Sequence, residues 1–101
     1  MNFDSNCTDF LKAIADDTRL RVVQQLMTGA KHVKAINSTL QVEQSLLSHH
    51  LKILKDAGIV ESVRDGKSVL YRLHPDVHAI HQEAGLDFGC CQIEFSAPEP
   101  K

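Results

Sequence analysis

A change of hydrophobic period partway along the chain most constrains its fold. Up to Ala57 the apolar residues recur at helical spacing. Beyond it they gather in two short β-rich runs, residues 59–63 and 68–73, on either side of Asp65-Gly66-Lys67. Asp-Gly between two such runs is a strong hairpin signal, because glycine tolerates the positive φ of a tight turn. The sequence therefore predicts helices followed by a β-hairpin, in one domain because 101 residues are too few for two.

Four helices are predicted before the hairpin, each from apolar residues that repeat every three or four positions. The second of them starts at residue 17 or 18 and is stopped by Gly29, and a brief turn at residues 41–42 separates the last two. Glycine after a helical pattern is a typical helix end. The predicted helices span about residues 6–15, 17–28, 31–39 and 43–57.

One more helix is predicted after the hairpin. It opens at Pro75, because proline suits the first turn of a helix, and it ends by Gly85. Glycines and prolines in the remainder predict a loop or extended tail. We therefore divide the chain into a folded domain, residues 1–84, and a cysteine-containing tail, residues 85–101.

These elements make a mainly α fold with a β-hairpin wing (α+β), the winged helix-turn-helix. Its third and fourth helices form the helix-turn-helix pair. The second helix of that pair enters the major groove of DNA.

The charge distribution fits a nucleic-acid partner better than the net charge of −2 suggests. Residues 18–75 contain nine lysines and arginines against four acids, whereas the two ends together contain two lysines against nine acids. A basic middle can meet phosphate while the acidic ends face solvent or another subunit. Taken alone, such variation is also compatible with ordinary fluctuation of charge along a chain.

Two sets of side chains are candidates for DNA contact. The outer stripe of the fourth helix is polar and opposite to its apolar stripe, and glutamine, serine and histidine can hydrogen-bond base edges or phosphates. Cations on the hairpin can reach the adjacent minor groove or its phosphates. The alternative is an ordinary solvated helix face. The candidates are Gln44, Ser45, Ser48, His49 and Lys52 on the helix, and Arg64, Lys67 and Arg72 on the wing.

Three motifs, in order, resemble the ArsR/SmtB family of winged helix-turn-helix transcriptional repressors. Residues 11–21 (LKAIADDTRLR) resemble its opening signature, residues 44–60 (QSLLSHHLKILKDAGIV) its recognition helix, and residues 64–73 (RDGKSVLYRL) its wing. Asp17 stands where the family usually has proline. The resemblance implies a homodimer, paired through its first and last helices, on double-stranded operator DNA with an imperfect inverted repeat. It also implies that a bound ligand weakens DNA affinity.

Two ligand sites known in the family match this sequence poorly. The positions of a Cys-x-Cys pair in the third helix are His32 and Lys34 here, so that site is absent. A site on the last helix is matched only in its first half, by Asp76 and His78. With His81 these residues form a second candidate metal site, because histidine and carboxylate suit Zn²⁺. The alternative is an exposed polar helix face.

The three cysteines are the main candidate for ligand binding. In a family dimer the first helix lies beside the last, which implies that the tail brings Cys90 and Cys91 near Cys7, within one chain or across two. Three thiolates suit As(III) or another soft metal ion better than Zn²⁺. A disulfide between adjacent cysteines is strained, and adjacent residues of an extended strand point to opposite faces unless the segment bends. Thiol redox sensing through Cys7 and one tail cysteine, and burial as small apolar residues, are the alternatives.

Other classes of protein fit less well. No glycine-rich phosphate loop or catalytic signature is present, and an 11.2 kDa chain has little room for a substrate cleft, so we do not expect an enzyme. No apolar run is long enough to span a bilayer, and the N-terminus does not resemble a signal peptide. We therefore expect a cytoplasmic protein with no membrane partner. A winged-helix module that binds protein is the rival class.

Overall fold

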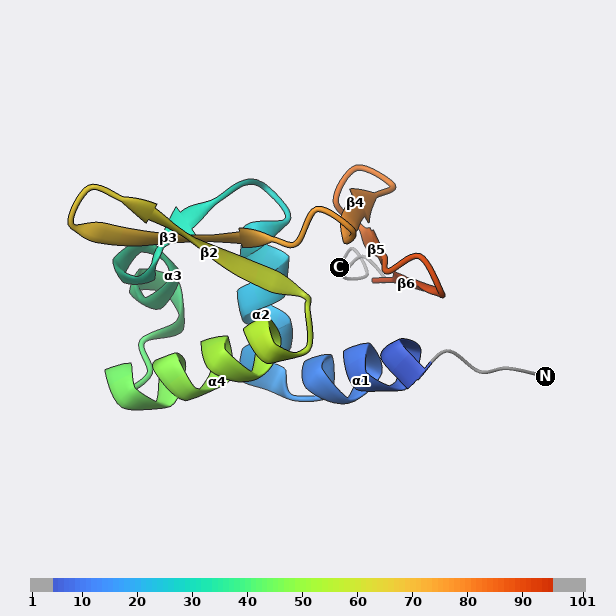
Figure 1. Cartoon of the computed structure of the whole chain (residues 1–101), viewed down its shortest axis with the longest axis horizontal. Helices are drawn as coiled ribbons and strands as arrows, with labels where there is room; N and C mark the ends of the chain where they lie inside the picture. The colour runs from blue at the N-terminus through green and yellow to red at the C-terminus, as the bar shows by residue number, and fades with distance from the viewer. Residues whose placement is uncertain (1–4, 96–101) are drawn as a thin grey trace, which may run out of the picture.

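The computed structural model describes residues 5–95. Four helices occupy its first part, as predicted, and each boundary lies within about two residues of the expected one. In Figure 1, α4 and α1 lie along the lower side of the molecule, the long β-hairpin lies along the upper side, and α2 lies between them. The helices are α1 (Ser5–Ile14), α2 (Asp17–Leu26), α3 (Val33–Leu40) and α4 (Gln44–Asp56).

The turn between α3 and α4 is fixed by the side chain of Asn37. Its amide nitrogen donates to the carbonyl of Val42 at 2.8 Å, and its amide oxygen accepts from the backbone N–H of Val42 at 2.9 Å. Gln41 has a φ of 56°, so it adopts the left-handed conformation that ends α3. Because both polar groups of one side chain are used, the relative orientation of the two helices is set locally.

The hairpin forms where the Asp-Gly signal predicts it. Strand β2 (Val60–Asp65) pairs antiparallel with β3 (Ser68–Leu73), and Asp65 faces Ser68 across a turn in which Gly66 has a φ of 62°. A two-residue strand, β1 (Lys31–His32), joins the free side of β3. The sequence predicted these two residues as the start of the third helix. They pair with Tyr71 and Leu70 instead, and the wing is therefore hydrogen-bonded to the residues that directly precede α3.

The prediction of a helix from Pro75 to Gly85 is wrong, because strands occupy this segment. Strand β4 (His78–Ile80) pairs with β5 (Gly85–Asp87), which pairs with β6 (Gln92–Glu94) in a second antiparallel sheet. The described residues 5–95 contain no helix after the wing. The predicted division between residues 84 and 85 falls between β4 and β5.

Tertiary packing explains why strands form here rather than a helix. The helical spacing in this segment rests on few apolar residues, and a sheet buries Val77, Leu86 and Phe88, all at most 4% exposed. Between β4 and β5 the chain turns through His81, Gln82 and Glu83, whose φ angles are all left-handed and therefore incompatible with a right-handed helix. The resemblance implied a homodimer paired through the first and last helices. Among residues 5–95 the helix expected after the wing is absent, so only α1 of that expected pair is present.

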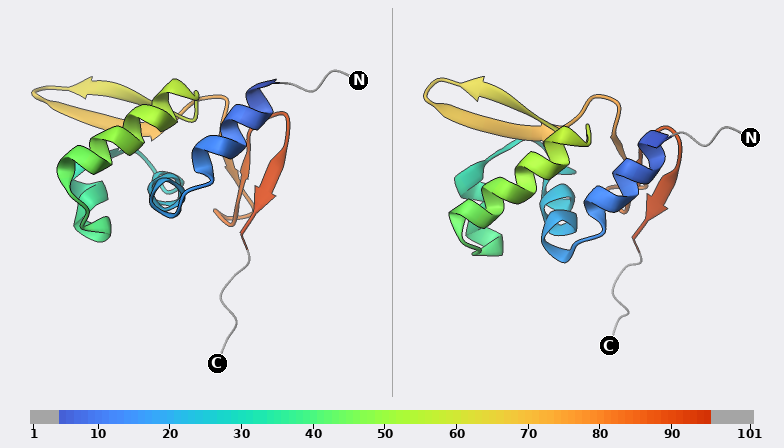
Figure 2. Two further views of the ribbon diagram at one scale, coloured as in Figure 1. Left: turned by 90° about the horizontal axis from the view of Figure 1, so that it is seen from below. Right: turned by 60° about the horizontal axis from the view of Figure 1, so that its bottom comes forward.

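One hydrophobic core holds the helices, the wing and the second sheet together. Phe10 of α1 stacks on Phe88 after β5, with ring centroids 5.2 Å apart. Figure 2 shows the second sheet beside α1, on the side away from α4 and the wing. The largest fully buried side chains come from α2, α3, α4, the start of β2 and β5: Val22, Val23, Ile36, Leu47, Leu51, Leu54, Ile59, Val60 and Leu86.

No helix among residues 5–95 combines the length and the apolar character that crossing a bilayer requires.

Candidate nucleic-acid interface and thiol cluster

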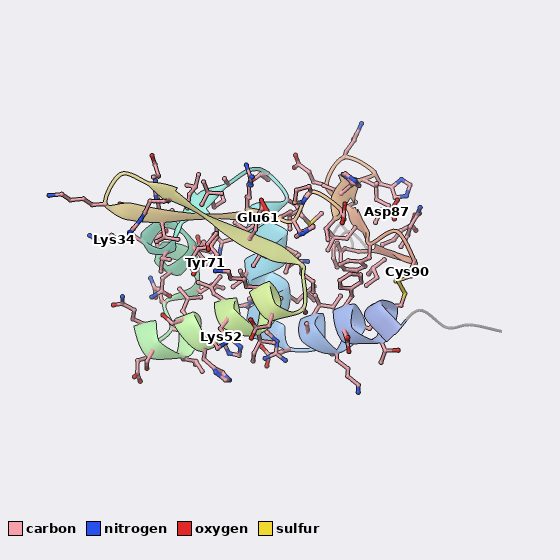
Figure 3. The ribbon with its side chains drawn as sticks, in the orientation of Figure 1. Lys34, Lys52, Glu61, Tyr71, Asp87 and Cys90 are labelled. Carbon is pink, nitrogen blue, oxygen red and sulfur yellow. A yellow bond between two sulfur atoms is a disulfide. The ribbon has the colours of Figure 1, made fainter. Side chains whose placement is uncertain are left out.

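The outer face of α4 is polar and exposed. Leu47, Leu51 and Leu54 point into the core and are at most 1% exposed, so the opposite stripe of the helix faces solvent. In Figure 3, Lys52 lies on this helix, on the side of the molecule opposite the wing. All five sequence-predicted residues of α4 are exposed: Gln44, Ser45, Ser48, His49 and Lys52.

Two of these residues have local partners. The Ser45 hydroxyl donates to Glu43 Oε1 at 2.6 Å, and Lys52 Nζ lies 3.0 Å from Asp56 Oδ2. Both members of the Lys52–Asp56 pair are more than half exposed. An exposed pair of this kind contributes only about 0–1 kcal/mol, so exchanging Asp56 for a phosphate costs Lys52 little.

The three predicted cations of the wing differ in their surroundings. Arg72 is paired with Glu61 on the neighbouring strand, through Nη2 at 2.8 Å and Nε at 2.9 Å. Arg64 and Lys67 lie at and beside the hairpin tip and form no ion pair with any residue in 5–95. Of the three predicted wing cations, the two without an ion pair among residues 5–95 therefore lie at the tip of the hairpin.

A shallow hollow of about 290 Å³ lies between α3 and the start of α4. Its lining includes Lys34 and Ser38 of α3 and Gln44 of α4. Lys34 is exposed and lies in the first turn of α3. The sequence prediction did not include Lys34 among the DNA contacts, although its position between the inward residues Val33 and Ile36 places it on the outer side of α3.

A polar junction connects α1, α2 and α4 behind the exposed face. Arg19 of α2 donates through Nε to the carbonyl of Ala13 in α1, and its Nη1 lies 3.2 Å from Nδ1 of His50 in α4. His50 is 8% exposed and is the only buried polar residue among those described. The sequence prediction assigned no role to Arg19 or His50, because their contact spans 31 residues.

Asp16 completes this junction from the start of α2. Its Oδ2 accepts a hydrogen bond from the backbone N–H of Arg19 at 3.0 Å and caps the helix. That hydrogen bond is the main reason that the pKa of Asp16 lies below its ordinary value; burial opposes it, and the charge of Arg19 assists it. Asp16 therefore remains a carboxylate and holds negative charge beside the Arg19 guanidinium.

The structure brings the three cysteines together within one chain. Cys7, in the first turns of α1, forms a disulfide with Cys90 in the loop between β5 and β6. Cys91 is a free thiol, and the three sulfur atoms all lie within 4.8 Å of one another. The disulfide is the yellow bond that joins the second sheet to α1 in Figure 3.

A bend in the β5–β6 loop places the two adjacent cysteines on one side. The backbone N–H of Phe88 donates to the carbonyl of Cys91 at 2.9 Å, and Gly89 takes a left-handed φ of 90°. As a result the sulfurs of Cys90 and Cys91 are 3.9 Å apart. An extended strand would have pointed them to opposite faces. Cys90 is exposed and the other two are half-buried, so small reagents have access to the cluster.

The second candidate metal site is not assembled in the structure. His81 pairs with Glu94 of β6 at 3.0 Å, and Asp76 lies 3.7 Å from His74. Across the described part of the chain, the cysteine cluster is the one group of three or more histidine, cysteine or acidic side chains with mutually close ligand atoms. Asp76, His78 and His81 do not form such a group.

Comparison with known proteins places this geometry in a family. Residues 16–62 match the model of the bacterial regulatory proteins of the arsR family. A biofilm growth-associated repressor of Agrobacterium fabrum is 36% identical over 84 residues, which cover 83% of this chain and 72% of that protein. The chain belongs to the ArsR family.

Two further curated relatives of this ArsR-family chain are transcriptional regulators by name. The repressor SmtB of Mycobacterium tuberculosis is 44% identical over 73 residues, covering 72% of this chain and 53% of that protein. An arsenic resistance transcriptional regulator of Pseudomonas putida is 40% identical over 67 residues, covering 65% and 52%. The chain thus spans about half the length of these two relatives. Their names agree with the expectation of a regulator rather than an enzyme.

A solved structure of a similar protein confirms the winged helix-turn-helix. The homodimeric DNA-binding domain of a possible ArsR-family regulator from Mycobacterium bovis superposes with a TM-score of 0.65 at 30% identity, covering 68% of this chain and 64% of that one. The predicted fold class is therefore confirmed, apart from the helix expected after the wing.

Proposed function

We propose that the protein is a sequence-specific DNA-binding repressor that acts as a homodimer on an inverted repeat in double-stranded DNA, in the cytoplasm. The exposed polar face of α4 supports this function, because it follows a locally fixed turn and lies opposite a buried apolar face. Residues 1–84 supply DNA binding and dimerisation. The proposed contacts are Gln44, Ser45, Ser48, His49, Lys52, Arg64, Lys67 and Arg72.

Two further observations favour this function. Leu11 on α1 is 45% exposed, which leaves a large apolar side chain on the outer side of that helix for a second subunit to cover. The solved relative from Mycobacterium bovis is described as homodimeric and DNA-binding. A dimer places two copies of α4 about one helical turn of DNA apart, near 34 Å.

Substitutions at the two kinds of contact are expected to have different effects. Gln44→Ala should reduce the preference for a duplex from the region upstream of its own gene over a random duplex by about 5- to 150-fold, since a bidentate base contact contributes about 1–3 kcal/mol of discrimination. Lys67→Ala should weaken binding to both duplexes alike and lower the salt slope by about one. Fluorescence anisotropy at several salt concentrations measures both effects. Equal losses on the two duplexes for Gln44→Ala would contradict base contact by α4.

We further propose that As(III) or another thiophilic metal ion, bound by Cys7, Cys90 and Cys91, releases the protein from DNA. The closeness of the three sulfurs and the exposure of Cys90 support this site, since soft thiolate ligands select soft metal ions. One relative is named an arsenic resistance regulator. The site requires all three cysteines to be reduced, because thiolates and not disulfides bind metals.

A titration of the DNA complex tests this release. Under reducing conditions, sodium arsenite should dissociate the complex of the wild-type protein, and Cys91→Ser should require at least about tenfold more arsenite, because it leaves two thiolates where three are needed. Cd²⁺ and Zn²⁺ serve as comparison ions, and alkylation of the thiols serves as the control. Unchanged DNA binding of the wild-type protein at saturating arsenite would refute metalloid release.

The Cys7–Cys90 disulfide favours a second candidate function, thiol redox sensing. Disulfides in reducing compartments are usually transient and redox-active. Oxidation by hydrogen peroxide would remove two electrons and two protons from Cys7 and Cys90, form the S–S bond and convert the peroxide to two molecules of water. Release from DNA by hydrogen peroxide, absent in Cys7→Ser, would favour this candidate over metal binding.

A further inference from the structure

The cysteine-bearing helix and the DNA-facing helix are joined by a chain of contacts whose centre is Arg19. We propose that Arg19 is a positioning residue that transmits the state of the thiol cluster to α4 through His50. The inference rests on the proposed function, since it concerns how a signal at Cys7, Cys90 and Cys91 reaches the exposed face of α4.

The first part of the connection is the attachment of α1 to the second sheet. Cys7 is bonded to Cys90, and one turn further along the helix Phe10 stacks on Phe88. Cys90 and Phe88 belong to the same loop, which follows β5. A change at the sulfurs therefore acts on the part of the sheet that also packs against Phe10, and it changes where α1 sits relative to that sheet.

The second part is the contact between the other end of α1 and α2. The carbonyl of Ala13 accepts a hydrogen bond from Arg19 Nε. Ala13 is 5% exposed, so water cannot readily replace Arg19 as the partner of this carbonyl. Any shift of α1 must be followed by Arg19 or must break this partly buried hydrogen bond.

The third part is the contact between Arg19 and α4. A guanidinium group only donates hydrogen bonds, so the Nδ1 atom of His50, 3.2 Å from Arg19 Nη1, must be the acceptor. Asp16 Oδ2 is 3.9 Å from the same Nδ1, which is too far for a hydrogen bond. Next to His50 in the chain is His49, an exposed residue of the proposed DNA-contacting face, and their ring centroids are 5.9 Å apart.

Arginine is the side chain that can make both contacts at once. Its planar group presents several N–H donors in a fixed fork, whereas lysine offers one compact ammonium group on a flexible chain. Phe10 also lies near Gly58 after α4, but an apolar contact of this kind is non-directional. The hydrogen bonds of Arg19 are directional, and they tie α4 to the position of α1.

The test measures coupling rather than affinity alone. The affinity for the upstream duplex is determined with and without saturating sodium arsenite, and with and without prior oxidation by hydrogen peroxide. The ratio of the two affinities is the response. A typical coupling between two sites corresponds to a ratio of about 5 to 150. Arg19→Lys should bring this ratio to within about twofold of one, while ultraviolet absorbance of the arsenic–thiolate bonds shows that arsenite still binds.

Two controls separate transmission from general damage. Arg21→Lys alters a neighbouring arginine of α2. Arg21 Nε lies 3.5 Å from Asp17 Oδ2, and both side chains are exposed, so this variant should keep the wild-type ratio. At position 50, His50→Asn retains an acceptor near the place of Nδ1 and should keep most of the response, whereas His50→Leu should lose it. If Arg19→Lys does not fold, the comparison of His50→Asn with His50→Leu still tests the proposal.

The outcomes distinguish the inference from the function on which it rests. A wild-type ratio of one for both arsenite and peroxide would remove the proposed sensing function, and the transmission through Arg19 with it. A responding wild-type protein together with an equal response in Arg19→Lys, or in His50→Leu, would overturn the role of Arg19 alone and leave the sensing function standing.

Discussion

Reduction of the Cys7–Cys90 disulfide is expected to lower the free energy of unfolding by about 2–4 kcal/mol. The two cysteines are 83 residues apart, so the bond closes most of the chain into a loop and restricts the unfolded state strongly. The same bond also attaches α1 to the second sheet in the folded state. Urea unfolding of the oxidised and the reduced protein, followed by circular dichroism, measures the difference.

Cys7→Ser is the control for this prediction. Cys90→Ser is a weaker control, because it leaves Cys91, whose sulfur belongs to the same cluster, free to pair with Cys7. Reductant should not change the stability of Cys7→Ser. An equal loss of stability in Cys7→Ser on adding reductant would show that the effect comes from some other source.

The second large effect is expected from a pair of adjacent leucines in α4. Leu47→Ala should lower the free energy of unfolding by about 2–5 kcal/mol, because Leu47 is fully buried and its truncation leaves a cavity. Leu46→Ala should change it by less than about 0.5 kcal/mol, since Leu46 is 44% exposed. The same substitution at neighbouring positions thus tests which side of α4 faces the core.

DNA binding extends this test from stability to function. Leu47 lies beneath the exposed polar residues of α4, so Leu47→Ala should also weaken binding to the upstream duplex under conditions where the variant is still folded. Thermal unfolding and anisotropy on the same samples provide both values. Similar losses of stability for the two alanine variants would contradict the orientation of α4 on which the proposed DNA contacts depend.

The sequence was sufficient for the part of the fold that rests on local signals. The helical spacing of α2 and α4 and the Asp65-Gly66 turn involve residues close together in the chain, and the structure has these elements where they were predicted. The same holds for the exposed stripe of α4, because helical geometry alone decides which side chains lie opposite Leu47 and Leu51.

The parts that failed or were missed depend on distant contacts. The segment after Pro75 was predicted as a helix, yet it pairs as strands. The second sheet packs against α1, where Phe88 stacks on Phe10 near the other end of the chain. Arg19 and His50 are 31 residues apart, and no local pattern indicates that they meet. The meeting of Cys7 with the tail cysteines was expected from the resemblance to a family dimer, within one chain or across two, and in the structure it occurs within one chain.

The small strand β1 has a consequence for how this protein would meet a duplex. It hydrogen-bonds the wing to the residues that lead into α3, and Lys55 of α4 donates to Ser62 of β2 at 2.9 Å. These contacts oppose movement of the wing relative to α4. On the proposed function, the DNA must adjust to the protein, and sequences that bend or narrow easily would be bound more tightly even where no base is touched.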